Sequence, residues 1–240
     1  MTAAAGAPEP LAALHLLLGA GALLALAGVP GLLMPRRSPW GPRLATLLTV
    51  CACLLGLAGA LPLLTAPEGA TLDFASPLPG HRAELGADAL SGWFAIPVFV
   101  VGGLGSIYGL AYWPARRRPR NGRRLRLCYG LLLASLVFVL LSRDGASFLV
   151  AWEVMALTNF FLVTIEEDDA AVRRAGWLYL LYSHVTILGL FALFTLERGL
   201  TGQFGFGAVA AGASSAGRTA LFLLALLAFG VKAGAMPLHS

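Results

Sequence analysis

The sequence predicts an all-α membrane protein, a polytopic bundle of about seven transmembrane helices. Hydrophobic residues make up 58% of the 240 residues and charged residues only 12%, whereas a soluble domain carries about a quarter charged residues. The mean hydropathy is +0.79. This composition excludes a soluble enzyme domain, a disordered tail and a nucleic-acid-binding module. The net charge of +5 comes from short basic runs between apolar stretches.

Seven apolar stretches are long enough, or nearly so, for the ~20 residues of one crossing. Charged residues or Pro/Gly-rich turns bound each of them. The predicted spans are Leu11–Leu33, Leu44–Leu64, Ala89–Trp113, Leu125–Ser142, Gly145–Ile165, Ala175–Leu196 and Thr219–Met236. The first is not a signal peptide, because Arg36 and Arg37 follow the apolar run instead of preceding it. The fourth is short, so Arg126 is expected to snorkel to the interface.

The arginines predict that the N-terminus lies outside the cell. With this orientation the inside loops contain twelve arginines and the outside loops four, as the positive-inside rule requires. The acidic cluster from Glu166 to Asp169 does not overturn the orientation, because the rule counts basic residues. A solvated loop is expected there, with a regulatory or partner-contact role as the alternative. In the outer loop, the run Thr71–Ala75 and the Pro79-Gly80 turn predict a short hairpin.

The third span carries an interfacial belt and a glycine pair. The aromatic residues of the belt are Trp93, Tyr108, Tyr112 and Trp113. Gly105 and Gly109 form a Gly-x-x-x-Gly pair, for which helix packing is the expected role.

The chain is expected to hold no cofactor and no metal. Its three cysteines, Cys51, Cys53 and Cys128, lie within or at the edge of apolar stretches, and no further ligand lies near the Cys-x-Cys pair. The spacing does not match an iron–sulfur motif. No catalytic residue is predicted.

Two charged residues lie deep in the predicted spans, Glu153 in the fifth and Lys232 in the seventh, and His184 lies in the sixth. At ~1.5 Å per residue, Glu153 is about 12 Å and Lys232 about 20 Å below the outer ends, and His184 is about 14 Å above the inner end. All three are therefore expected near mid-membrane. Lys232 is the only lysine, since the other sixteen basic residues are arginines.

Ionisable residues inside a span are costly and indicate function. A nearby carboxylate favours the charged form of a lysine and burial disfavours it, so a moving Glu153 would make Lys232 take up or release a proton. A histidine such as His184 can relay that proton. The alternative is a static Glu153–Lys232 ion pair, with His184 as a hydrogen-bonded contact between helices.

Three residues around Lys232 predict an interrupted seventh helix: Gly230, Gly234 and Pro237. Broken membrane helices are tolerated where they line a polar cavity. The alternative for the two glycines is a helix-packing face.

The same residues resemble a known family. The stretch Phe229–Ser240, which reads FGVKAGAMPLHS, is similar to the seventh-helix motif of antiporter-like proton-translocating subunits. These occur in NADH:quinone oxidoreductase, in Mrp cation/proton antiporters and in energy-converting membrane hydrogenases. Further similar segments are Leu72–Phe74, Ala87–Ser91 with Phe94, Val150–Leu157 and Phe161–Val163. The KAGxMPLHS wording and Leu180–His184 most resemble the hydrogenase branch, of the hydrogenase 4 component B and formate hydrogenlyase type.

The resemblance implies a role for each candidate residue and for the protein. Glu153 would modulate Lys232, Lys232 would carry the proton, and His184 would belong to the hydrophilic axis. The protein would be a non-redox, proton-translocating subunit of a redox-driven complex in the inner membrane of a prokaryote. Its partners would be the bilayer, sister antiporter-like subunits and, indirectly, peripheral redox subunits. The alternative is a subunit of a cation/proton antiporter or of an inorganic-carbon uptake system, without electron transfer.

The resemblance also implies a division of the chain. Family members have about fourteen helices with two inverted five-helix repeats, so a chain ending at Ser240 is expected to be an N-terminal fragment. Residues 1–126 would hold three spans, with the outer loop 65–88 and the basic inner loop 114–126. Residues 127–240 would be an incomplete antiporter-like repeat containing spans four to seven.

Overall fold

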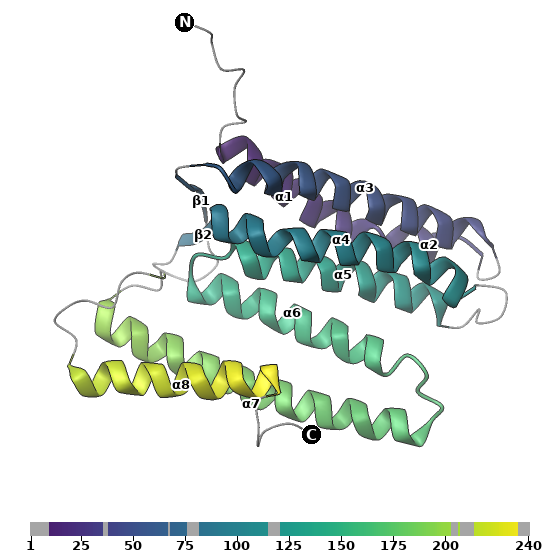
Figure 1. The fold of residues 1–240 in the computed structure, drawn as a ribbon. Helices are drawn as coiled ribbons and strands as arrows, with labels where there is room; N and C mark the ends of the chain where they lie inside the picture. The colour runs from purple at the N-terminus through teal and green to yellow at the C-terminus, as the bar shows by residue number, and fades with distance from the viewer. Residues whose placement is uncertain are drawn as a thin grey trace, which may run out of the picture.

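The computed structural model describes residues 10–35, 38–66, 68–75, 82–114, 121–202, 206 and 214–234. These residues form eight helices and one two-stranded sheet (Figure 1). The elements are α1 (Pro10–Leu26), α2 (Val29–Leu33), α3 (Trp40–Leu63), β1 (Ala70–Ala75), β2 (Arg82–Ala87), α4 (Ala89–Tyr112), α5 (Gly122–Leu141), α6 (Gly145–Val163), α7 (Ala170–Thr201) and α8 (Ser215–Ala233). Within them, seven helical segments are long and apolar enough to cross a membrane. The predicted all-α membrane bundle is confirmed.

The spans lie side by side, and successive spans run in opposite directions (Figure 1). α1 and α3 occupy one side of the bundle, α4 and α5 follow, then α6, and α7 and α8 form the opposite side. The described parts of the connections that were predicted to be outside lie at one end, together with the two strands, and those of the connections predicted to be inside lie at the other. This alternation agrees with the spans read from the sequence.

Two spans differ from their predicted form. The first is interrupted, because α1 ends at Leu26 and α2 begins at Val29. Gly28 lies in the interruption, where a Cβ atom would be 2.3 Å from Cα of Leu127 on α5. The sixth is longer than predicted, since α7 has 32 residues and so spans about 48 Å at ~1.5 Å per residue, more than the ~30 Å hydrocarbon core.

Side chains just before four helices mark where those helices begin. Asp88 accepts a hydrogen bond from the Ser91 amide before α4, and Asp144 accepts one from the Ser147 amide before α6. The side chains of Asp169 and Ser214 do the same for α7 and α8. Such caps satisfy amides that have no partner within the helix. They therefore fix the register in which α6, α7 and α8 present their side chains.

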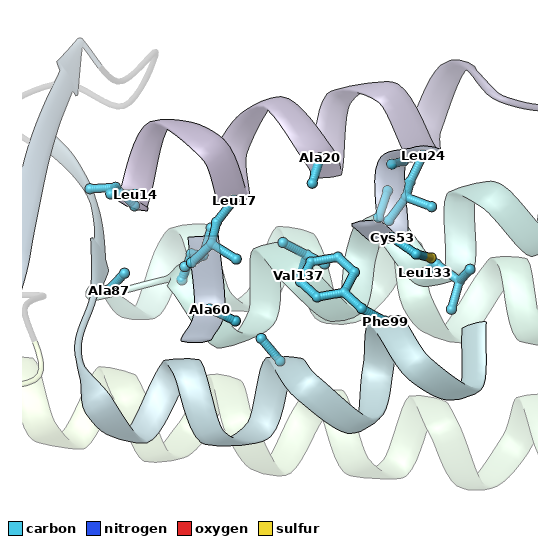
Figure 2. Packing of buried hydrophobic residues seen from close by; sticks show 14 of the residues in the cluster. Leu14, Leu17, Ala20, Leu24, Cys53, Ala60, Ala87, Phe99, Leu133 and Val137 are labelled. Carbon is cyan, nitrogen blue, oxygen red and sulfur yellow. The ribbon is translucent and has the colours of Figure 1, made fainter. Parts of the chain in front are cut away.

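The described buried residues gather in two apolar clusters. The first joins α1, α3, α4 and α5, and Figure 2 shows Phe99 of α4 among side chains of its neighbours. Small residues let these helices approach closely: a Cβ atom on Gly56 would be 2.2 Å from Cζ of Phe99. The second cluster joins α6, α7 and α8 around Trp152, Leu190 and Phe194. The predicted division of the chain between residues 126 and 127 falls within α5 and stays a prediction. α5 itself packs into the first cluster.

The predicted hairpin strand is present at the outer end. β1 and β2 pair in antiparallel fashion with Leu72 opposite Leu85, while the predicted Pro79-Gly80 turn lies outside the described residues. The Glu84 amide donates to Oδ2 of Asp144 at 2.9 Å, and the Arg143 amide donates to the Glu84 carbonyl at 2.9 Å. The hairpin is thereby joined to the α5–α6 connection.

An ion pair reinforces this outer end. Nη2 of Arg143 lies 3.1 Å from Oδ2 of Asp88. Burial raises the pKa of Asp88, but the amide and hydroxyl of Ser91 and the charge of Arg143 outweigh it and lower the pKa below its usual value. Asp88 is therefore ionised at neutral pH, and it connects the start of α4 to the α5–α6 turn.

The acidic connection between α6 and α7 is exposed, as expected for a solvated loop. Glu167 pairs with Arg124 at 3.0 Å, and its carbonyl accepts a hydrogen bond from Arg173 at 2.8 Å. Asp169 caps α7. Arg126, in the first turns of α5, donates to the Gly122 carbonyl, and so it binds backbone near the inner end of its span.

Candidate functional site

Lys232 lies in the last turn of α8. The helix ends at Ala233, and Gly234 follows with φ of 68°, a left-handed conformation that glycine adopts without strain. The Gly234 amide donates to the carbonyls of Gly230 and Val231. A cation in the last turn is favoured by the partial negative charge of the helix C-terminus. The local sequence therefore ends the helix directly beside the lysine.

Three side chains hold the Lys232 ammonium. Nζ donates to Oη of Tyr179 at 3.0 Å and to Oγ of Ser183 at 3.1 Å. It also lies 4.7 Å from the ring centroid of Tyr179 and 5.9 Å from that of Trp152, within the range of a cation–π contact. We call Trp152, Tyr179 and Ser183 the lysine cradle. Its hydroxyls and ring faces stabilise a positive charge without supplying a negative one.

Helix periodicity and close packing assemble this cradle. Tyr179 and Ser183 are four residues apart, so they lie on one face of α7. α8 approaches that face closely, because a Cβ atom on Gly189 would be only 3.2 Å from Cβ of Ala228. Phe229 then packs edge-on against Trp152 of α6, with ring centroids 5.9 Å apart. The last turn of α8 is thus held between α6 and α7.

The cradle lies near the middle of the bundle. Tyr179 and Ser183 are about 14 Å and 20 Å along α7 from Ala170 at ~1.5 Å per residue. Figure 1 shows the C-terminal end of α8 lying beside the middle of α7. Lys232 is therefore far from both ends of the helices around it.

Glu153 lies next to Trp152 on α6 and is half-buried. Among the described residues it forms neither an ion pair nor a hydrogen bond through its carboxylate, and the ion pairs found there do not include Lys232. Consecutive helix residues point about 100° apart at 3.6 residues per turn, so Trp152 and Glu153 face different directions. The structure thus places Glu153 one residue from the cradle without an ion pair to Lys232.

His184 follows Ser183 on α7, but its side chain is exposed. Nδ1 lies 2.8 Å from the Leu180 carbonyl of the same helix. Ser183 is only 4% exposed and contacts Lys232, so the two neighbours occupy different faces of α7. Of the three predicted titratable residues, Lys232 is in the cradle, while Glu153 and His184 are adjacent to cradle residues in sequence and point elsewhere.

The cradle residues were not predicted from the sequence. Tyr179 and Ser183 are polar, lie four residues apart within an apolar span, and could have been found by that helical spacing. Of the three residues predicted to interrupt the seventh helix, Gly230 accepts a capping hydrogen bond and Gly234 ends the helix. Pro237 lies outside the described residues.

The described part of the chain contains no group of three or more histidine, cysteine, aspartate or glutamate residues that could hold a metal ion. In the Cys-x-Cys pair, Cys51 is exposed and Cys53 is buried in the first apolar cluster. Fold and site together define a multi-pass helical membrane protein with a single lysine held near the middle of its spans.

Comparison with protein families and with known proteins extends this description. Residues 142–240 match the family described as "NADH:quinone oxidoreductase/Mrp antiporter, TM". Hydrogenase-4 component B of Escherichia coli (strain K12) is 30% identical over 168 residues, which are 70% of this chain and 25% of that protein. An uncharacterized protein of Mycobacterium tuberculosis (strain ATCC 25618 / H37Rv) is 35% identical over 170 residues, 68% of this chain and 25% of that protein.

Chains of three solved membrane complexes share the fold. A chain of the Mrp complex from Dietzia sp. DQ12-45-1b has a TM-score of 0.75 at 23% identity, over 95% of this chain and 42% of that one. A chain of the archaeal membrane-bound sulfane sulfur reductase has a TM-score of 0.70 at 21% identity, over 90% and 34%. A chain of respiratory complex I from Thermus thermophilus has a TM-score of 0.68 at 20% identity, over 93% and 45%.

These similarities confirm the predicted resemblance, including the similarity to hydrogenase 4 component B. Residues 142–240 therefore carry the similarity to the antiporter-like family of membrane subunits. The chain spans about a quarter of the length of the curated relatives it matches.

Proposed function

We propose that this chain contributes a proton path to a membrane subunit of a redox-driven respiratory-type complex, with Lys232 as the proton carrier. The observation that supports this most directly is the lysine cradle. Its hydroxyls and rings hold a single cation between three helices far from either end of the bundle. A half-buried cation at this depth is costly, and such residues within spans usually have a role. Among the described ion pairs, none includes Lys232, so a static ion pair does not account for it.

The arrangement suggests how a proton would leave and reach Lys232. A hydroxyl both donates and accepts hydrogen bonds, so Ser183 and Tyr179 could accept a proton from Nζ and pass another one onward. The lysine would then become a neutral amine. Re-protonation would follow when Glu153 approaches, because a nearby carboxylate favours the ammonium form. His184, which follows Ser183 on α7, would be the relay on the far side of that helix.

The same proposal assigns location and partners. The subunit would lie in the inner membrane of a prokaryote, beside sister antiporter-like subunits, and peripheral redox subunits would drive it indirectly. The similar chains of solved structures all come from membrane complexes. Electron transfer would occur in those partners, and this chain would carry no cofactor of its own.

A second candidate is a cation/proton antiporter subunit, or a partner in inorganic-carbon uptake, without electron transfer. The similarity in fold to a chain of an Mrp complex, with a TM-score of 0.75, favours it. Neighbouring genes discriminate between the two candidates. Hydrogenase or NADH-oxidoreductase subunits encoded nearby would support the redox-driven complex, and a run of small antiporter subunits would support the second candidate.

Replacement of Lys232 tests the main proposal. We expect Lys232→Met in the complete complex, reconstituted in sealed vesicles, to lower redox-coupled proton translocation at least about ten-fold, a change of ~1.4 kcal/mol in the barrier. Arg218→Met is the matched control, because it removes an exposed cation near the start of the same helix. Unchanged coupling in Lys232→Met would refute the role of Lys232. Sodium-driven proton movement without an electron donor would favour the second candidate.

A further inference from the structure

A second feature, a mainly apolar cavity with one charged residue in its lining, lies at the inner end of the bundle, away from the lysine cradle. A cavity of about 230 Å³ opens there between α3, α4, α5 and the end of α6. Its lining includes Gly105, Tyr108, Gly109, Tyr112, Arg126 and Tyr129. Pockets that enclose whole drug-sized ligands measure about 300–1,000 Å³. This smaller, mainly apolar space suits a segment of a chain-like molecule better than a whole cofactor.

Arg126 brings a positive charge to this cavity. Its guanidinium donates to the carbonyls of Gly122 at 2.8 Å and Trp113 at 3.2 Å. No acidic residue in the described part of the chain pairs with it, whereas Arg124 and Arg143 each have a carboxylate partner. A guanidinium has five donors, so further donors remain for an anion. A half-buried cation whose described partners are carbonyls would be stabilised by a bound anion.

The lining also shows where the cavity meets lipid. Tyr108 and Tyr112 stack with ring centroids 5.4 Å apart, and both are about two-thirds exposed, at 65% and 66%. Exposed tyrosines at the end of a span are typical of the membrane interface. The cavity therefore opens toward the bilayer at the depth of the headgroups.

The two glycines of the pair in the third span, Gly105 and Gly109, have different surroundings at this cavity. A Cβ atom on Gly105 would be 2.4 Å from Oη of Tyr129, so Gly105 is a packing residue as predicted. A Cβ atom on Gly109 would meet no described atom within 4 Å, although Gly109 lines the cavity. Among the described residues, the expected packing contact is found for Gly105 and not for Gly109, which lines a channel beside Tyr108.

We propose that this cavity binds one anionic phospholipid of the inner leaflet. Its phosphate contacts the guanidinium of Arg126, and one acyl chain enters the channel beside Gly109. Charge complementarity favours this occupant, because the inner loop that precedes α5 contains Arg116, Arg117, Arg118 and Arg120. Basic residues near a membrane surface attract anionic lipid. Basic pockets between spans on this side of a membrane suit such headgroups.

The headgroup contact is tested by counting bound lipid. The complete protein is delipidated in detergent and titrated separately with phosphatidylglycerol and phosphatidylcholine, and the lipids retained are counted by native mass spectrometry. We expect one phosphatidylglycerol to be retained where phosphatidylcholine is not. Arg126→Gln should weaken its binding about ten-fold or more, as expected for lost hydrogen bonds to a charged group. Arg174→Gln, an exposed arginine at the inner end of α7, is the control and should change binding less than about two-fold.

The acyl-chain contact has its own variant. A Cβ atom at position 109 meets no described atom within 4 Å, so Gly109→Leu projects its side chain into the channel. Leucine favours a helix more than glycine does, so folding is not expected to suffer. This variant should weaken phosphatidylglycerol binding while Arg126 is intact. Gly199→Leu on α7, where a Cβ atom also meets nothing described within 4 Å, is the control and should have no effect.

The proposal is overturned by any of three results. The first is equal retention of phosphatidylcholine and phosphatidylglycerol by the unmodified protein. The second is binding in Arg126→Gln as tight as in Arg174→Gln, and the third is unchanged binding in Gly109→Leu. Redox-coupled proton translocation by the Lys232 variants does not enter this test, so the two proposals fail independently.

Discussion

Helices α1, α3 and α5 bury 39%, 44% and 39% of their most apolar segments, whereas α6, α7 and α8 bury 22%, 22% and 11%. The first group packs through small residues in close contact around Phe99. The second group surrounds a cation and shares fewer buried side chains. Few buried contacts make small displacements inexpensive. α4, which carries Phe99, buries 22% of its most apolar segment, as α6 and α7 do. The difference therefore suggests a firm support formed by α1, α3 and α5, beside three helices that can adjust around Lys232.

The largest expected effect contrasts two glycines, one from each region. A Cβ atom on Gly28 would lie 2.3 Å from the backbone of Leu127, whereas one on Gly189 would lie 3.2 Å from Cβ of Ala228. Overpacking costs ~1–3 kcal/mol and occasionally more. We expect Gly28→Ala to lower the free energy of unfolding by about 3 kcal/mol and Gly189→Ala by about 1 kcal/mol or less. Denaturation in mild detergent measures the unfolding free energy of both variants. Equal losses in the two variants would contradict the proposed difference in packing between the two regions.

Removal of the cradle hydroxyls should have the next largest effect. Tyr179→Phe with Ser183→Ala leaves the Lys232 ammonium without its two hydrogen bonds. Hydrogen bonds to charged groups contribute ~1.5–3 kcal/mol, so we expect redox-coupled proton translocation to fall about ten-fold. Tyr182→Phe is the matched control, since Tyr182 lies on the same helix and is not among the described contacts of Lys232.

A combined variant separates function from structure at the cradle. In a Lys232→Met background, the two hydroxyl replacements should cause no further loss of translocation, because the ammonium that donates to these hydroxyls is absent. A further loss of similar size would mean that Tyr179 and Ser183 act independently of Lys232. The double-variant protein should also remain assembled, which size-exclusion chromatography of the complex verifies.

The positions of the spans were readable from the sequence, but their ends were less so. Each predicted span overlaps a helical segment, because runs of apolar residues between charges suffice to mark a crossing. α7 extends beyond its predicted span since Arg173, Arg174, Glu197 and Arg198 were assigned to loops, although Asp169 and Gly202 cap the helix outside them. Charge marks the end of the apolar segment, whereas capping residues mark the end of the helix.

The sequence predicted the depth of the candidate site in the membrane, but not the directions in which its side chains point. Counting residues placed Glu153, His184 and Lys232 in one layer, and Lys232 does lie near the middle of the bundle. Depth along a helix does not specify which way a side chain points, because that depends on how neighbouring helices pack. Ser183 and His184 occupy nearly the same depth, yet one is buried against Lys232 and the other is exposed.

A smaller effect is expected where the two regions meet at the outer end. Asp88, which caps the start of α4, pairs with Arg143 before α6, and the side chain of Asp88 is 48% exposed. The pair should contribute about 0.5 kcal/mol. Because the pKa of Asp88 is lowered on folding, this contribution is present above the usual aspartate value of about 3.9 and is lost as the pH falls through the lower folded value. Asp88→Asn should therefore destabilise the protein at pH 7, and the difference should shrink as the pH falls below the usual aspartate value. A difference that does not change with pH would contradict this assignment.

The smallest effect is expected at the inner end, where Arg124 of α5 pairs with Glu167 before α7. Their side chains are 33% and 59% exposed, and exposed ion pairs contribute ~0–1 kcal/mol that salt reduces. The Glu167 carbonyl, which accepts a hydrogen bond from Arg173, is unaffected by a change of side chain. We expect Glu167→Gln to lower the unfolding free energy by less than about 0.5 kcal/mol at low salt and by nothing measurable at high salt. A larger loss of unfolding free energy that does not depend on salt would mean that this ion pair stabilises the contact between the two regions as strongly as the packing of α5 against α6.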